Sequence, residues 1–319
     1  MCLHPRFIVN RKYIKLAGSS IDAISMFGYA PDLYVLVDCG NCLPCQKKRS
    51  NSWRQRLIDE FNYLVEKDPS VAHRVYFATL TLAPKFYKKD VKHAYSLFKK
   101  FRERYRKRYC KSLRYWVTTE YGEKRGRLHF HAIFFDPLFT GADLLSLWSY
   151  GRVDMSVVGD SPKTPERDPL KGIAYVTKYI TKYCDTWFVD PSKKSNIFCS
   201  PGLGLAYVRD PKNRHFHSQH GGLRFRLSDN NMPIGLPRYY IDKLFSPVDK
   251  LRFSKLNIER LINPPEFPIK LGKQLFYSFE TYLQFVNSIG GYVPLTSEAF
   301  KKLKPIEQLL YVTQNFSYE

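Results

Sequence analysis

The stretch of residues 128–135 constrains the fold of this chain more than any other. It reads Leu-His-Phe-His-Ala-Ile-Phe-Phe, and its first part alternates apolar and polar side chains. Alternation with a period of two predicts a β-strand whose successive side chains point to opposite faces of a sheet. His129 and His131 then share one face, where the two imidazoles either bind one metal ion or are simply solvated. The residues predicted to face the core are Leu128, Phe130, Ala132 and Phe134.

A second β-prone run, residues 114–120, precedes this strand and ends at Glu120. Residues 121–126 lie between the two runs, include two glycines and predict a hairpin turn. In one of the two strand registers, the carboxylate of Glu120 lies on the same face as His129 and His131. Two neutral imidazoles and one carboxylate make a three-ligand metal site with positions left open for a substrate. Such a site suits Lewis-acid activation of a phosphate oxygen.

Residues 173–184 are predicted to form a helix that carries two tyrosines. At 100° per residue, the stripe that contains Tyr175, Lys178, Tyr179 and Lys182 is separate from the stripe of aliphatic residues. Core packing would place tyrosines among the aliphatic side chains, so both tyrosines are predicted to point outward. The adjacent ammonium groups are expected to favour the phenolate and to stabilise charge on a phosphoryl group.

The order of these motifs resembles that of the HUH endonucleases, which start rolling-circle DNA replication. A Thr-Leu-Thr strand (residues 79–81) comes first, then the His-x-His strand, then a Tyr-x-x-x-Tyr-x-x-Lys helix. The paired tyrosines resemble the branch found in small single-stranded DNA phages. Four further segments are similar to the replication initiation proteins of gokushoviruses, within the microvirus family. These are residues 1–3, the Cys-x-x-Cys-x-x-Cys run at 39–45, Ser-Pro-Gly-Leu-Gly at 200–204 and Leu-Pro-Arg-Tyr-Tyr at 236–240.

This resemblance implies metal-dependent, site-specific nicking of single-stranded DNA at a replication origin. Strand transfer would pass through a 5′-phosphotyrosine, and the second tyrosine would act when a round of replication ends. The order in which the two tyrosines act stays open. The implied metal ligands, for Mg²⁺ or Mn²⁺, are His129, His131 and Glu120. The implied catalytic residues are Tyr175 and Tyr179 as nucleophiles, with Lys178 and Lys182 as phosphate contacts. The Thr79 and Thr81 strand would support the site without a catalytic atom.

The expected fold is α+β, with a ferredoxin-like or RRM-like HUH core. Its central antiparallel sheet would carry the two site strands, with helices packed on the opposite face. The expected division is a Cys-rich basic segment at residues 1–70, the HUH core at 71–190 and a C-terminal extension at 191–319.

Seven cysteines, an odd number, fit a reducing compartment better than a disulfide framework. Cys39, Cys42 and Cys45 have the spacing of metal ligands, and Cys2 is the best fourth ligand, with His4 next. A structural Zn²⁺ is therefore predicted. Free thiols are the alternative, and iron–sulfur clusters use the same spacing.

The charge balance predicts a polyanionic partner. Lys and Arg number 51 against 29 Asp and Glu, a formal charge of +22, and aromatic residues make up 16% of the chain. Aromatic side chains interleaved with basic ones can stack on unpaired bases, although a basic run is also explained by a solvated helix face. The predicted DNA-contacting residues are Lys47, Lys48, Arg49, Arg102, Arg104 and Arg106.

The expected partners are single-stranded viral DNA with its origin, a host helicase and a DNA polymerase, in the bacterial host cytoplasm. A membrane partner is not expected, because no apolar run approaches about 20 residues. A second His-x-His, at His215 and His217, is predicted to be two surface histidines in a loop. Two rival functions stay open: a zinc-stapled nucleic-acid-binding protein without catalysis, and an HUH plasmid initiator or transposase.

Overall fold

The computed structural model describes most of the chain, and the chain divides into two compact units. Residues 46–244 form one unit, and residues 1–45 together with 245–319 form the other. The described residues are 2–4, 6–9, 34–87, 91–122, 127–160, 168–181, 194–219, 225–227, 233–250, 253, 269–271 and 274–289.

A five-stranded sheet forms the centre of the unit at residues 46–244, in the order β6-β3-β5-β4-β7. Every neighbouring pair is antiparallel. Helix α4 connects β3 to β4 and helix α5 connects β5 to β6, which is the β-α-β-β-α-β order of a ferredoxin-like fold. Strand β7 adds to this core at the β4 edge. The bounds are β3 Val75–Thr81, α4 Val91–Tyr109, β4 Arg114–Tyr121, β5 Leu128–Phe135, α5 Gly141–Trp148, β6 Val153–Val157 and β7 Ile197–Cys199. The α+β class with an antiparallel sheet is confirmed.

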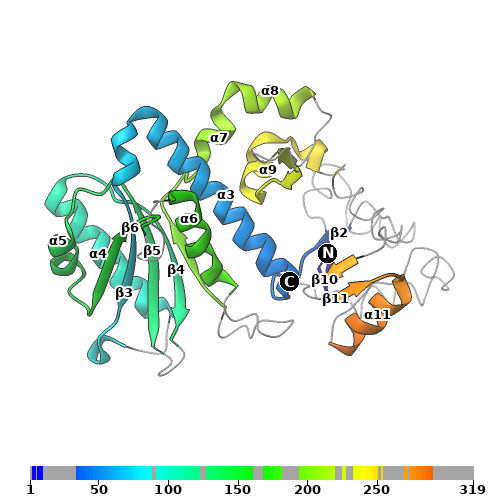
Figure 1. The fold of residues 1–319 in the computed structure, drawn as a ribbon, viewed down its shortest axis with the longest axis horizontal. Coiled ribbons are helices and arrows are strands. Elements are labelled where there is room, and N and C mark those ends of the chain that lie inside the picture. Colours follow the sequence, from blue (N-terminus) through cyan, green and yellow to red (C-terminus); the bar gives the residue numbers. More distant parts are fainter. Residues whose placement is uncertain are drawn as a thin grey trace, which may run out of the picture. The chain divides into compact units, whose positions relative to one another are not determined.

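Helices α4 and α5 cover one face of this sheet (Figure 1). The apolar face of β5 packs beneath them, and Phe130 and Phe134 are fully buried beside Phe101 of α4 and Trp148 of α5. Burying these large side chains removes apolar surface from water, which stabilises the fold. The core positions predicted from the alternation along β5 are therefore confirmed.

Helices α3 (Leu43–Lys67) and α6 (Pro169–Thr177) pack on the other face of the sheet (Figure 1). We expected helices on one face only. Strand β5 explains why helices cover this second face. Ile133 and Phe135 follow the histidines on the same face and are apolar. This half of the face is buried against Leu57 of α3 and Ile173 of α6.

The described residues between 201 and 244 contact α3 through polar groups. Arg56 donates two hydrogen bonds to the carbonyl of Leu203, at 3.2 and 2.9 Å. Asp59 accepts hydrogen bonds from Arg226 and from the hydroxyl of Tyr240, both at 2.6 Å. Further elements of this unit are the 3₁₀ turns η2 Pro69–His73, η3 Pro84–Phe86 and η4 Lys178–Ile180, the helices α7 Leu205–Arg209, α8 Pro211–Gln219 and α9 Arg238–Leu244, and the paired strands β8 Phe225–Leu227 and β9 Pro233–Gly235.

The described residues of the second unit include two short antiparallel strand pairs and helix α11. Phe276 of β11 packs against Tyr282 and Phe285 of α11, with ring centroids 5.7 and 5.1 Å apart. The elements are β1 Arg6–Val9 paired with β2 Tyr34–Val37, β10 Ile269–Leu271 paired with β11 Gln274–Phe276, and α11 Phe279–Ser288. Within the described part of the chain, no helix has the length and apolar character needed to cross a membrane.

Candidate active site

The register of the sheet places the two histidines beside the Thr-Leu-Thr strand. His131 pairs with Thr79 and His129 with Thr81 across β5 and β3. The Oγ1 of Thr79 lies 3.3 Å from Nδ1 of His131, and the Oγ1 of Thr81 lies 3.0 Å from Nδ1 of His129. When a hydroxyl accepts from Nδ1–H, the ring keeps a free lone pair on Nε2, which is then available for a metal ion. These threonine contacts were not foreseen from the sequence.

Glu120 lies directly across from His129 on the neighbouring strand β4. Its Oε2 is in hydrogen-bond contact with Nε2 of His131, and both residues are buried. Of the two possible strand registers, the structure therefore has the one that places the Glu120 carboxylate on the histidine face. A buried carboxylate and an imidazole nitrogen are donor groups of the kind that divalent cations bind.

His129 does not join this pair in a compact set of three ligand atoms. Among the residues that the structure describes, a cysteine cluster is the only group of three or more His, Cys, Asp or Glu whose ligand atoms all lie within 4.8 Å. The structure thus brings Glu120 and His131 together without closing the three-ligand set. Gly122 makes room for the ring of His129, because a Cβ at Gly122 would lie 2.7 Å from its Nε2.

The two tyrosines lie beside His131. Helix α6 ends at Thr177 and continues as the 3₁₀ turn η4, so Tyr175 and Tyr179 occupy different kinds of turn. Their hydroxyl oxygens are 3.1 Å apart. The ring of Tyr179 stacks on the ring of His131, with centroids 3.8 Å apart and planes 12° from parallel. The tyrosine pair, His131 and Glu120 are thus one continuous cluster of side chains.

Only Tyr175 points outward as expected, with 55% of its surface exposed. Tyr179 is half-buried and packs against the aliphatic cluster that contains Ile173 and Val176. Tyr179 thus faces the sheet, where its ring stacks on that of His131, instead of open solvent. Burial, reinforced by the hydrogen bond with Tyr175, raises the pKa of Tyr179, which opposes the expected activation by lysines. Lys178 is exposed, and Lys182 lies outside the described residues.

Two glycines set the position of helix α6. Gly159, at φ +92°, follows β6, and Gly172 lies in the second turn of α6. A Cβ on Gly172 would lie 2.5 Å from the backbone N of Gly159, so the two segments approach as closely as only glycine permits. Asp168 caps the helix by accepting a hydrogen bond from the backbone N–H of Lys171 at 2.9 Å. The cap and the close contact together fix where the tyrosines stand.

Four cysteine sulfurs form a compact cluster in the other unit. The Sγ atoms of Cys2, Cys39, Cys42 and Cys45 all lie within 4.8 Å of one another. Three of the separations are 3.3, 3.8 and 3.9 Å, far longer than a disulfide bond and close to the roughly 3.8 Å set by tetrahedral zinc–sulfur bonds of about 2.3 Å. Cys2, and not His4, completes the set of four.

Backbone N–H groups already point at these sulfurs. The N–H of Cys39 donates to Sγ of Cys2 at 3.2 Å, and the N–H of Leu3 donates to Sγ of Cys42 at 3.4 Å. Hydrogen bonds among the thiols, that with Cys2 first, lower the pKa of Cys42 to about 7 and also lower the pKa of Cys39, whereas such bonds raise the pKa of Cys2 and of Cys45. Metal ions bind the thiolate form, so the cluster could hold a metal ion such as zinc.

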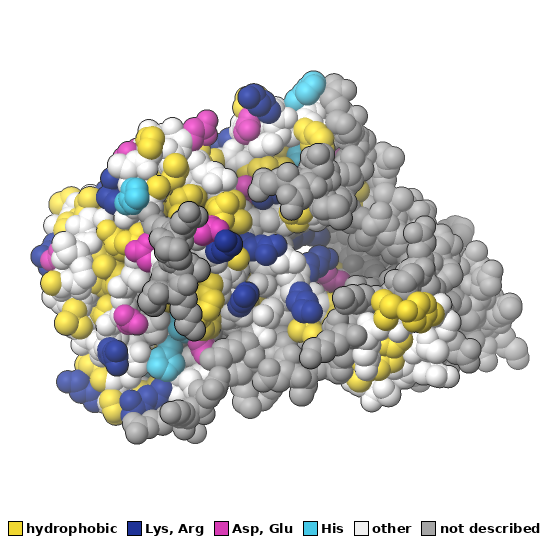
Figure 2. Space-filling view, in the orientation of Figure 1, with side chains coloured by type: hydrophobic (Ala, Val, Ile, Leu, Met, Phe, Trp, Pro, Cys, Tyr) yellow, Lys and Arg dark blue, Asp and Glu magenta, His cyan; other side chains and the backbone are white. Residues whose placement is uncertain are grey.

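Four of the six predicted DNA-contacting residues fall into two groups. Lys47 and Lys48 are exposed on α3, and Figure 2 shows Lys and Arg side chains on the face that carries α6 and the adjoining part of α3. The Arg49 guanidinium instead donates to the carbonyl of Ser195 at 3.0 Å, and that of Arg104 donates to the carbonyls of Leu147 and Trp148. Arg49 and Arg104 therefore have structural roles.

The prediction for the second His-x-His motif was wrong. His215 and His217 lie in helix α8, and His217 is buried with its Nε2 3.1 Å from the hydroxyl of Tyr207. The absence of apolar alternation around this motif excluded a strand, but it did not exclude a helix.

Comparison with known proteins gives two matches. Residues 75–184 match the family model of replication-associated proteins of the ORF2 type, and this range contains the strands and tyrosines of the candidate site. The match covers about a third of the chain. A replication-associated protein ORF4 of Chlamydia phage 1 is 27% identical over 164 residues, and the match covers 43% of this chain and 36% of that relative. Together the matches support a replication initiator of the microvirus type, as the motifs predicted. No solved structure matches the chain.

Proposed function

We propose that this protein nicks single-stranded phage DNA at the replication origin and keeps the 5′ end on a tyrosine. One observation carries the proposal: the ring of Tyr179 lies on His131, whose Nε2 contacts Glu120, while Tyr175 extends the same cluster to the surface. Nucleophiles and candidate metal ligands are thus adjacent, within the residues that match the replication-associated family. Packing alone does not require a surface phenol at this place.

His131, Glu120 and His129 would hold a divalent cation, Mg²⁺ or Mn²⁺, which would polarise the scissile phosphate. The donor set fits such an ion, since it combines a buried carboxylate with imidazoles whose Nδ1 atoms have hydroxyl partners. The positive charge would also favour ionisation of Tyr179, whose pKa is raised by burial.

The tyrosines would supply the nucleophile. The phenol oxygen of one tyrosine bonds to phosphorus while the bond from phosphorus to the 3′ oxygen breaks, and that oxygen leaves as a 3′-hydroxyl after taking a proton. The other phenol, 3.1 Å away, can hydrogen-bond the attacking oxygen and is placed to accept the strand in a later transfer. The 3′-hydroxyl would prime a host polymerase, with a host helicase opening the duplex in the bacterial cytoplasm. Lys178, which is exposed, and Lys182 would contact phosphates.

We also propose that the cysteine cluster holds one structural zinc. Cys42 and Cys45 are buried, and the cluster offers four sulfur ligands. Four protein ligands are typical of a structural zinc centre, which leaves no open position for catalysis. The ion would join residues 2–4 to the start of α3.

Covalent trapping on a denaturing gel tests the nicking proposal. Wild-type protein incubated with origin-containing single-stranded DNA and Mg²⁺ should give a protein–DNA adduct. No adduct should form when a chelator is present from the start. The conservative Glu120→Gln variant and His131→Ala should lose adduct yet keep DNA binding, which depends on separate phosphate contacts. His215→Ala is the matched control, because it removes an exposed histidine from α8 of the same unit. Retained DNA binding with no adduct from the wild type would instead support the non-catalytic DNA-binding function.

A further inference from the structure

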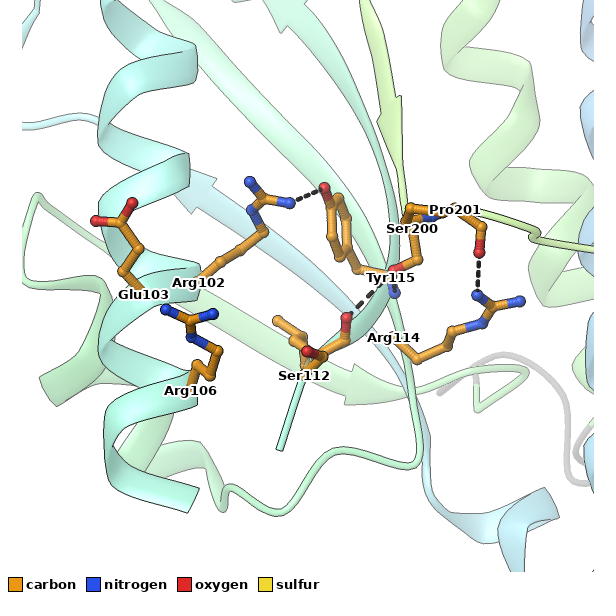
Figure 3. A pocket seen from close by; sticks show the side chains of 9 residues that line it. Arg102, Glu103, Arg106, Ser112, Arg114, Tyr115, Ser200 and Pro201 are labelled. Carbon is orange, nitrogen blue, oxygen red and sulfur yellow. Dashed lines mark hydrogen bonds between the residues drawn. The ribbon is translucent and has the colours of Figure 1, made fainter. Parts of the chain in front are cut away.

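A pocket of about 400 Å³ lies between α4 and the start of β4 (Figure 3). Arg102 and Arg106 extend into it from α4, and Arg114 and Tyr115 line it from β4. A volume of this size is in the range of small-ligand sites. None of the proposed catalytic or metal-binding residues lines this pocket.

The pocket is separate from the tyrosine site. Tyr115 belongs to the core cluster beneath α4 with Phe98, whereas Tyr179 packs against the cluster on the other face of the sheet. Along β4, Arg114 and Glu120 are also about 20 Å apart at 3.4 Å per residue. One bound nucleotide cannot contact both places.

Two guanidinium groups in the pocket have donors to spare. Each guanidinium nitrogen of Arg114 has a partner, because Arg114 pairs with Glu60 at 2.7 Å and donates to the carbonyls of Pro201 and Gly202. Arg102 donates to the hydroxyl of Tyr115 at 2.6 Å, but its Nε is buried and has no partner within the described part of the chain. Arg106, one turn further along α4, is exposed and its side chain makes no ion pair with the described residues.

These spare donors suit a phosphate oxygen, which guanidinium groups bind in bidentate fashion. Glu60 neutralises Arg114, so Arg102 and Arg106 against Glu103 leave the pocket with a net charge of +1. That charge balances a phosphodiester, which carries one negative charge, better than a triphosphate. We infer that the pocket binds a backbone phosphate of single-stranded DNA at a distance from the cut. This inference rests on the proposed function for its substrate.

Salt-dependent binding of a fluorescent oligothymidylate, measured without added Mg²⁺ or Mn²⁺, tests the inference without any nicking. For single strands, each phosphate contact adds about 0.7 to the slope of log affinity against log salt. Arg106→Gln should lower the affinity about tenfold and the slope by about 0.7, as expected for one charge-assisted contact. Since Arg106 is exposed, this variant should fold normally, and Arg102→Gln should act in the same direction.

Lys107→Gln is the matched control, since it removes the same charge from an exposed neighbouring position of α4 outside the pocket. Equal effects of Lys107→Gln and Arg106→Gln would overturn the inference, and so would an unchanged slope in Arg106→Gln. ATP that displaces the oligothymidylate from the wild type but not from Arg106→Gln would identify a free nucleotide as the occupant and also overturn it. A protein that fails to nick but shows the expected slopes would contradict the proposed function alone.

Discussion

At the scale of single residues, the threonines of β3 determine how the histidines are presented. The sequence predicted a strand with Thr79 and Thr81 beside the histidine strand, and it indicated no function for their hydroxyls. The contact depends on the β3–β5 register, which pairs Thr79 with His131 and Thr81 with His129. Register is set by the whole sheet, so a local pattern cannot reveal which hydroxyl meets which ring.

Replacing Thr81 with Val should weaken the proposed metal site. Valine keeps the shape and strand preference of threonine but leaves Nδ1 of His129 without its hydroxyl partner. Loss of such a partner costs about 10–100-fold in metal affinity, so Mn²⁺ binding measured by calorimetry should fall by about that factor.

Thr118→Val provides the control. Thr118 also lies across from His131, on β4, but its buried Oγ1 has no hydrogen-bond partner within the described part of the chain. Mn²⁺ affinity should therefore stay unchanged in this variant. Equal losses in the two variants would mean that the hydroxyl contact does not matter.

At the scale of elements, the placement of the tyrosine helix is the decisive feature. Its start is visible in the sequence, since Asp168 and Pro169 are favourable residues for a helix N-terminus. The change to a 3₁₀ turn at Lys178 is not visible, and neither is the contact between Gly159 and Gly172, because both depend on how this segment packs in the folded chain. The sequence therefore predicted the nucleophile stripe but not the depth at which Tyr179 is buried.

Gly172→Ala should slow cleavage without preventing DNA binding. The added Cβ would meet the backbone of Gly159 at 2.5 Å, so α6 must move and carry Tyr175 and Tyr179 with it. A displacement of about 1 Å at a reacting group can cost about 100-fold in rate, and single-turnover adduct formation should show a loss of that order.

Gly141→Ala is the matched control at the start of α5. A Cβ there would meet only the end of the Met155 side chain, at an ordinary 3.7 Å. Its adduct rate should equal that of the wild type. A wild-type rate in Gly172→Ala would show that the glycine contact does not position the tyrosines.

At the scale of the whole molecule, the central antiparallel sheet was more predictable than its surroundings. Two strands of the sheet, those of Glu120 and of the histidines, could be predicted from their local sequence patterns. The ferredoxin-like arrangement was implied by the family resemblance. Contacts such as Arg56 with Leu203 and Asp59 with Arg226 join residues more than 140 positions apart and leave no local signal. The division at residues 70 and 190 stays a prediction, while packing places residues 46–244 in one compact unit.

Metal removal should affect the cysteine cluster in a defined way. Elemental analysis of the purified protein should find about one zinc per chain, and strong chelation should remove it and lower the thermal stability. Cys42→Ser should abolish zinc binding, because it deletes one of four ligands. Cys110→Ser changes an exposed cysteine outside the cluster and should retain the metal. Iron in place of zinc, or no metal, would contradict the zinc proposal.

The central claim is that Tyr175 and Tyr179 are the residues that become linked to DNA. Mass spectrometry of a protease digest of the trapped adduct tests this directly, because it identifies the modified residue. We expect nucleotide-bearing peptides with the modification on Tyr175, on Tyr179 or on a mixture of the two, and no adduct from the variant with phenylalanine at both positions. A modification on Tyr183, or an adduct that persists in the double variant, would contradict the account.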